Sequence, residues 1–188
     1  MAGRNPYEAV TNFLEPLNLA VSMFTRDQLS LSPGGRHPRA EEDPPHSVIL
    51  NRGQLSRLRR DPALGLLLAL HYDIVEAKGE LGPWKTTCTK YEYAFHWWDD
   101  PQRELLAFHW HPEDPSVDWP HVHLKAEVLH ENAPFTGRKL RLPTGRISVE
   151  YVLQMAVMEM GAEALDPDRW DEVLRASEEI FRTYRTWG

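Results

Sequence analysis

The sequence contains a single cysteine, Cys88, among its 188 residues. One thiol cannot form an internal disulfide, and it cannot supply a metal site built from several cysteines. Such sparse cysteine usage is typical of proteins from a reducing compartment, so we expect a cytoplasmic location. The first residues also lack a basic segment followed by an apolar run, so we expect no secretion.

Long apolar runs are lacking as well. The longest stretch, residues 64–70, is interrupted by Gly65 and is far shorter than the roughly 20 residues that a membrane-spanning helix needs. We therefore expect no membrane insertion. A net charge of −7 and a pI near 5.7 argue against a broadly basic surface, so any contact with RNA or DNA would be local.

The remaining composition is that of a globular protein, with 41% hydrophobic residues and bulky core material that includes seven tryptophans and six tyrosines. The length suits a single domain over residues 1–188. Residues 33–46 have no apolar periodicity and are rich in proline and glycine, which predicts a mobile surface loop. We expect His37 and His46 of this loop to face the solvent.

Local patterns predict further elements before the central region. Asn5 followed by Pro6 indicates a helix start, and Pro16 indicates its end. Residues 17–24 then alternate as in a strand. Four arginines within residues 52–60 predict a short helix with a solvated basic face.

The centre of the chain predicts an antiparallel β-meander with strands at 66–78, 84–98, 103–111 and 121–130. The second strand is aromatic on one face and polar on the other, since Tyr91, Tyr93, Phe95 and Trp97 alternate with Lys90, Glu92, Ala94 and His96. Two C-terminal helices follow: one from Ser148 to Gly161 that is apolar nearly all round, and one from Asp166 with a single apolar stripe. The predicted fold is therefore α+β, with both helices packed on the aromatic face of the sheet.

Two His-x-His pairs lie on the third and fourth predicted strands: His109 with His111, and His121 with His123. Side chains two apart in a strand share a face, so each pair presents both imidazoles to one side. Pairing of His111 with His121 would place His109 opposite His123. The four histidines would then cluster on the polar face.

The turn at residues 99–102 brings two charged side chains to the same face. It sets Glu92 beside His109 and Lys90 beside His111. The first predicted strand would add two more residues to this face, His71 and Asp73.

Three interpretations of this face remain open. In the first, His109, His111, His121 and His123 bind a divalent transition metal such as zinc, nickel, iron or manganese, with Glu92 as a ligand or general base. In the second, His109, His123 and Glu92 perform metal-free acid–base cleavage of a phosphodiester while Lys90 holds the phosphate. In the third, the histidines only shape the surface of a non-catalytic protein-interaction module.

The segments His111-Pro112-Glu113 and Trp119-Pro120-His121-Val122-His123, preceded by the aromatic strand 91–96, resemble the TumE family of toxin–antitoxin proteins. The resemblance covers about residues 84–130. The sequence departs from the family pattern at residues 107–110, where Ala-Phe-His-Trp stands in place of Asp-Asn-Ala-Pro, and in the spacing of the final histidines. The resemblance implies a prokaryotic cytoplasmic toxin that acts on RNA and has an antitoxin as its protein partner.

Overall fold

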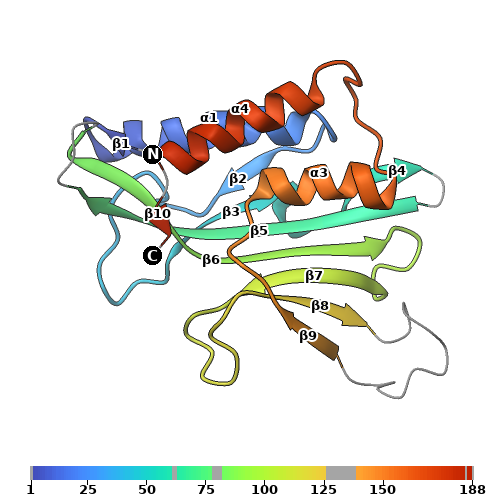
Figure 1. The fold of residues 1–188 in the computed structure, drawn as a ribbon. Coiled ribbons are helices and arrows are strands. Elements are labelled where there is room, and N and C mark those ends of the chain that lie inside the picture. The colour runs from blue at the N-terminus through green and yellow to red at the C-terminus, as the bar shows by residue number, and fades with distance from the viewer. Residues whose placement is uncertain (1, 61–62, 78–81, 126–138, 185, 188) are drawn as a thin grey trace.

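We analysed a computed structural model of the chain, which describes residues 2–60, 63–77, 82–125, 139–184 and 186–187. The described strands join in one sheet with the path β2-β3-β5-β6-β7-β8-β9, while β1 and β10 pair with β6 and β4 pairs with β5 (Figure 1). The strands are β1 (Ala2–Gly3), β2 (Leu29–Leu31), β3 (His46–Leu50), β4 (Ser56–Arg60), β5 (Ala63–Glu76), β6 (Trp84–Trp97), β7 (Glu104–Trp110), β8 (His121–Lys125), β9 (Lys139–Pro143) and β10 (Thr186–Trp187).

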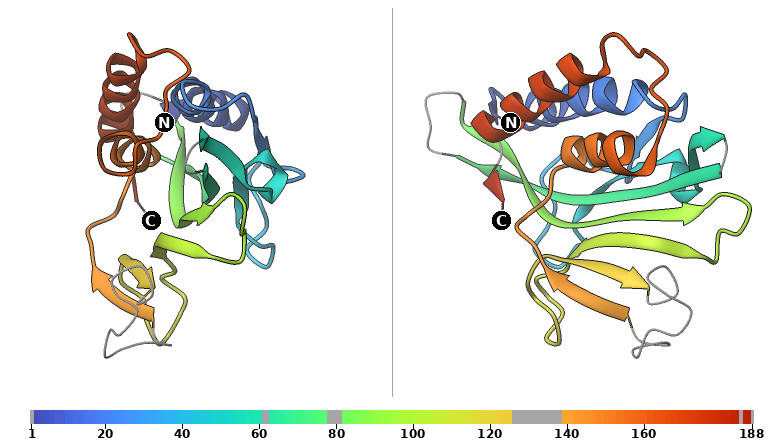
Figure 2. Two further views of the ribbon diagram at one scale, coloured as in Figure 1. Left: turned by 90° about the vertical axis from the view of Figure 1, so that its right-hand side faces the viewer. Right: turned by 45° about the vertical axis from the view of Figure 1, so that its right-hand side comes forward.

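Three described helices cover one face of the sheet: α1 (Pro6–Ser22), α3 (Val149–Met160) and α4 (Trp170–Tyr184). Figure 2 shows them grouped on the same side. Beneath them lie aromatic residues from the central strands, with Tyr91, Tyr93 and Phe95 completely buried. The predicted α+β fold, with an antiparallel meander and two C-terminal helices on its aromatic face, is confirmed.

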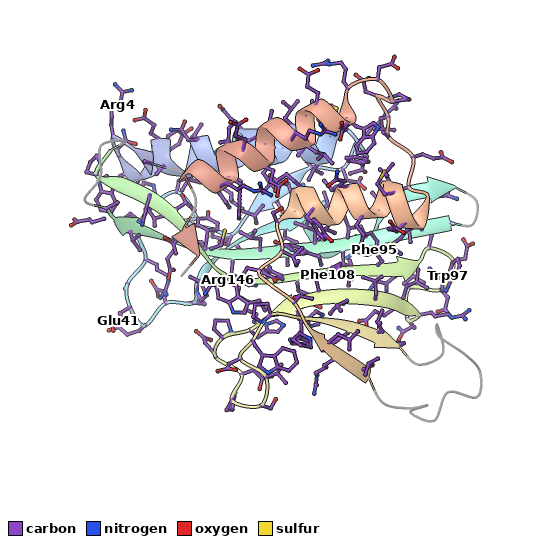
Figure 3. All side chains as sticks on the ribbon, in the orientation of Figure 1. Arg4, Glu41, Phe95, Trp97, Phe108 and Arg146 are labelled. Carbon is purple, nitrogen blue, oxygen red and sulfur yellow. The ribbon has the colours of Figure 1, made fainter. Side chains whose placement is uncertain are left out.

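The predicted pairing of β6 with β7 is confirmed from Tyr91 to Phe95, whereas a register shift between Phe95 and His96 changes the pairing next to the turn. Tyr91 lies opposite Trp110, Tyr93 opposite Phe108, and Glu92 opposite His109. This register keeps every aromatic residue of the two strands on the helix side, where burial of each large side chain contributes about 1.5–3 kcal/mol. Figure 3 labels Phe95 and Phe108 on these adjacent strands.

The predicted pairing of β7 with β8 is wrong by two residues. His109 lies opposite His121, and His123 lies opposite Ala107. The shift moves Val122 to Phe108, which joins two apolar side chains across the core face. Because the side-chain period of a strand is two, the shift leaves the histidines on the predicted face. The residues predicted beyond the observed strand ends, at 78 and 126–130, lie outside the described residues.

The N-terminal helix is longer than predicted. It continues through Pro16 to Ser22, so the strand predicted at 17–24 is wrong. A proline inside a helix costs about 3 kcal/mol, and here the continued helix buries Leu17, Ala20 and Val21 against the sheet and its neighbours. None of the described helices combines the length and the apolar character needed to cross a membrane.

Two other predictions for the first third of the chain are corrected. The arginines at 57–60 lie on strand β4 and not on a helix, because Ser56 and Leu58 alternate into the interior at two-residue spacing. His46 is not solvated: it is the first residue of β3, it is buried beside the Tyr72 ring, and its Nε2 lies 2.7 Å from the His37 carbonyl oxygen. His37 is exposed, as predicted.

Candidate metal centre

The sheet has a second face, opposite the helices, which we call the histidine face. It carries the side chains that alternate with the aromatic core along β5 to β8. These side chains include His71, Lys90, Glu92, His109, His121 and His123. Cross-strand partners point to the same side of a sheet, so the strand pairing alone assembles this set.

Three histidines of this face form a close group, which we call the three-histidine group. His109 comes from β7, and His121 and His123 come from β8. One ring nitrogen from each lies within 4.8 Å of the others, which makes the group geometrically able to hold a metal ion. All three are buried, at 9%, 3% and 5% exposure. The sequence prediction that these three histidines share a site agrees with this arrangement.

The neighbours of His121 and His123 determine where their hydrogens lie. The Nδ1 atom of His121 lies 2.8 Å from the Trp119 carbonyl oxygen, which only accepts, so this nitrogen carries a hydrogen. Arg141 donates from Nε to His123 Nε2 at 3.2 Å, so that nitrogen presents a lone pair.

The Nε2 atoms of His121 and His123 lie 2.8 Å apart. A neutral imidazole nitrogen has one lone pair, and at His123 Nε2 this lone pair accepts the Arg141 N–H. A metal ion or a proton on His123 Nε2 would therefore displace the hydrogen bond from Arg141. A backbone carbonyl on the far nitrogen, as at His121, is the usual support of a metal-binding imidazole.

His111 lies beside the three-histidine group. Its Nε2 is 3.4 Å from His109 Nδ1, and the two rings meet edge to face. Burial lowers the pKa of His111, and the positive charge of Lys90 lowers it further. Of the four predicted metal ligands, the structure thus brings three together and places the fourth in contact with one of them.

Glu92 borders the group from the neighbouring strand. Its Oε1 lies 3.9 Å from His109 Nε2, and half of its side chain is exposed. This separation is longer than a hydrogen bond, and it places the carboxylate at the edge of the three-histidine group.

Arg141 is a residue of the site that the sequence analysis missed. It lies on β9 directly opposite His123, and its guanidinium reaches the three-histidine group. A signal was present, because Leu140 and Leu142 alternate with Lys139 and Arg141 as in a half-buried strand. If a fifth strand of the meander had been predicted from this alternation at residues 139–142, it would have placed Arg141 on the histidine face.

His71 and Asp73 lie on the histidine face, as the first hairpin predicted. His71 pairs with Lys90, and its pKa is lowered first by burial and then by the Lys90 charge. Asp73 accepts hydrogen bonds from the Arg39 guanidinium, with the Nε to Oδ1 distance at 2.6 Å. Asp73 therefore fastens the 33–46 loop to the sheet.

Comparisons with protein-family models, with curated proteins and with solved structures gave no match to this chain.

Proposed function

We propose that the three-histidine group binds a divalent transition metal, with zinc as the first candidate ahead of nickel, iron and manganese. The observation that carries this proposal is the convergence of the His121 and His123 Nε2 atoms at 2.8 Å, with a ring nitrogen of His109 within 4.8 Å. Imidazole nitrogens are ordinary ligands for these metals. Three histidines leave a coordination position open, which is typical of catalytic zinc and not of structural zinc.

We propose further that the site is hydrolytic and acts on a phosphodiester, with RNA as the substrate. Such a metal, when bound, supplies Lewis-acid polarisation of the phosphoryl oxygen and a more acidic water. Glu92 would act as the general base, since it lies at the edge of the group and is open to solvent. The positive charges of Lys90 and Arg141 flank the histidines and would hold the phosphate.

Metal analysis tests the first part of the proposal. Protein purified without a histidine tag and without a metal column is dialysed and measured by mass spectrometry of the elements. We expect about one equivalent of metal in the parent chain. We expect less than a tenth of an equivalent in His121→Ala, and an unchanged content in His37→Ala, which removes an exposed histidine outside the site. A parent chain that stays below a tenth of an equivalent after incubation with zinc would refute the metal site.

A second candidate is metal-free acid–base cleavage, and the 2.8 Å contact between His121 and His123 favours it, because two imidazole nitrogens at this distance can exchange a proton. A single assay of RNA cleavage separates the two. Full activity in excess chelator supports the metal-free route, whereas loss of activity that zinc restores supports the metal. If the His109→Ala/His123→Ala double variant cleaves RNA as fast as the parent, both routes are wrong. If the chain cleaves no RNA in any of these conditions, the result supports the third interpretation, in which the histidines only shape a protein-interaction surface.

A further inference from the structure

A cavity of about 840 Å³ opens on the histidine face beside the three-histidine group. Its sides come from Pro44 and Pro45 of the 33–46 loop and from the turn at 112–114. Its sheet side consists of His71, Thr89, Lys90 and His111. The volume lies within the range that small-molecule sites usually occupy.

A β-bulge in β6 places two of these residues. His71 pairs with Lys90 whereas Tyr72 pairs with Cys88, so Thr89 is the extra residue on β6. Because of this bulge, Thr89 and Lys90 both line the cavity although they are consecutive in the chain. Bulges recur beside binding sites because they redirect side chains in this way.

Lys90 supplies an available positive charge. Within the part of the chain that the structure describes, no carboxylate lies within ion-pair distance of its ammonium group. His71 and His111 line the same cavity and add hydrogen-bonding ring nitrogens beside this charge.

Two polar atoms of the lining also lack partners. Thr89 Oγ1 and His71 Nδ1 are buried and make no hydrogen bond to any described residue. Buried polar atoms are nearly always hydrogen-bonded, so such atoms mark places where a ligand or an ordered water completes the structure. Rotation of either side chain toward the cavity would present a donor or an acceptor next to Lys90.

We infer that this cavity binds a ligand with one phosphate group and a flat apolar body. The phosphate would bind to the Lys90 ammonium, with Thr89, His71 and His111 as further donors, and the body would lie against the prolines. Glu113 and Asp114 stand exposed at the turn that lines the cavity, and their negative charges disfavour a polyphosphate.

His111 connects this cavity with the three-histidine group, since it lines the cavity and contacts His109 at 3.4 Å. A phosphate beside His111 would thus lie next to the proposed metal. The idea that this ligand is a nucleotide unit of the RNA substrate rests on the proposed function. The binding of a phosphate-bearing ligand in the cavity does not rest on it.

Isothermal titration with adenosine 5′-monophosphate, against adenosine as the uncharged probe, tests the inference on protein freed of metal by chelator. We expect the monophosphate to bind and adenosine to bind at least tenfold more weakly. Lys90→Met should weaken monophosphate binding at least about tenfold, as expected for the loss of a charged hydrogen-bond partner. Lys85→Met, on the same strand and outside the cavity lining, should bind like the parent.

The outcomes separate this inference from the proposed function. Absence of monophosphate binding, equal binding of adenosine, or an unchanged affinity in Lys90→Met each overturns the cavity as a phosphate site. Monophosphate binding that requires zinc and is unchanged in Lys90→Met also overturns the cavity as a phosphate site, while it supports the metal centre. Lys90-dependent binding in a chain that never takes up metal supports the cavity and refutes the metal proposal. Far-ultraviolet circular dichroism of each variant checks that a lost signal does not come from a lost fold.

Discussion

Both faces of the central strands hold buried side chains, but the side chains differ in kind. On the helix side, Tyr91 and Phe95 lie beneath the helices in an apolar core. On the histidine face, His109, His121 and His123 are almost as inaccessible, and they contact one another, with His109 and His123 ring centres 4.4 Å apart. Apolar side chains are stabilised by packing alone, whereas buried imidazoles also need hydrogen-bond partners. The second face therefore carries groups that can bind a ligand through polar contacts.

The largest loss of stability should come from removing an aromatic ring on the helix side of the sheet. Phe95→Ala should lower the free energy of unfolding by about 3–5 kcal/mol, because it leaves a cavity in the packed core. Urea denaturation measures this loss. The matched change on the other face, Leu67→Ala, should cost less than half as much, since Leu67 is only half-buried. Equal losses would mean that the two faces do not differ in packing.

A smaller effect should follow from changing the charge on the histidine face. Arg141→Gln removes a positive charge that donates to His123 Nε2 at 3.2 Å, so the variant should bind zinc about three- to tenfold more tightly. Competition with a fluorescent zinc chelator measures the affinity. Arg103→Gln, which alters an exposed arginine near Trp97, serves as the control and should bind like the parent. Weaker zinc binding in Arg141→Gln would instead assign Arg141 a supporting role in holding the ligands.

The smallest effect should appear in the pH dependence of stability. The pKa of His71 is lowered in the folded chain, chiefly by burial, so the unfolded chain binds more protons once the pH falls below about 6.5. The contribution of the neutral ring is therefore complete above that pH and is lost as the pH falls toward the folded pKa. His71→Gln should lose less stability than the parent between pH 7 and pH 5, as measured by urea denaturation. His37→Gln should follow the parent curve, and a parallel curve for His71→Gln would contradict the assignment.

The sequence was most informative in the strands whose apolar and polar side chains alternate. The alternation from Lys90 to Trp97 predicted the partner of Glu92 correctly, because a slip by one residue would expose aromatic rings. The turn at 99–102 does not set this register by itself, since the pairing shifts between Phe95 and His96. The same reasoning failed by two residues for His121, since the longer connection between β7 and β8 does not determine its own register. Hydrophobic alternation identifies the face of a strand, and it does not identify the partner along that face.

Other features depend on contacts that no local pattern contains. The predicted helix ended too early, at Pro16, because helix propensity does not include the stability gained from side chains that a longer helix buries. The bulge at Thr89 could not be predicted either, since the strand pattern around it remains regular in composition. Arg141 was missed because its strand follows a long segment without strand signals, although its own alternation was visible.

The two-residue period of the strands has a further consequence for how this site tolerates a slip in register. A slip of β8 by two residues along β7 would leave every imidazole on its side of the sheet. A slip by one residue would turn Val122 outward and the histidines into the apolar core. Because the connection from residue 111 to residue 120 does not fix the register, the apolar side chains of β8 are what hold its histidines beside His109.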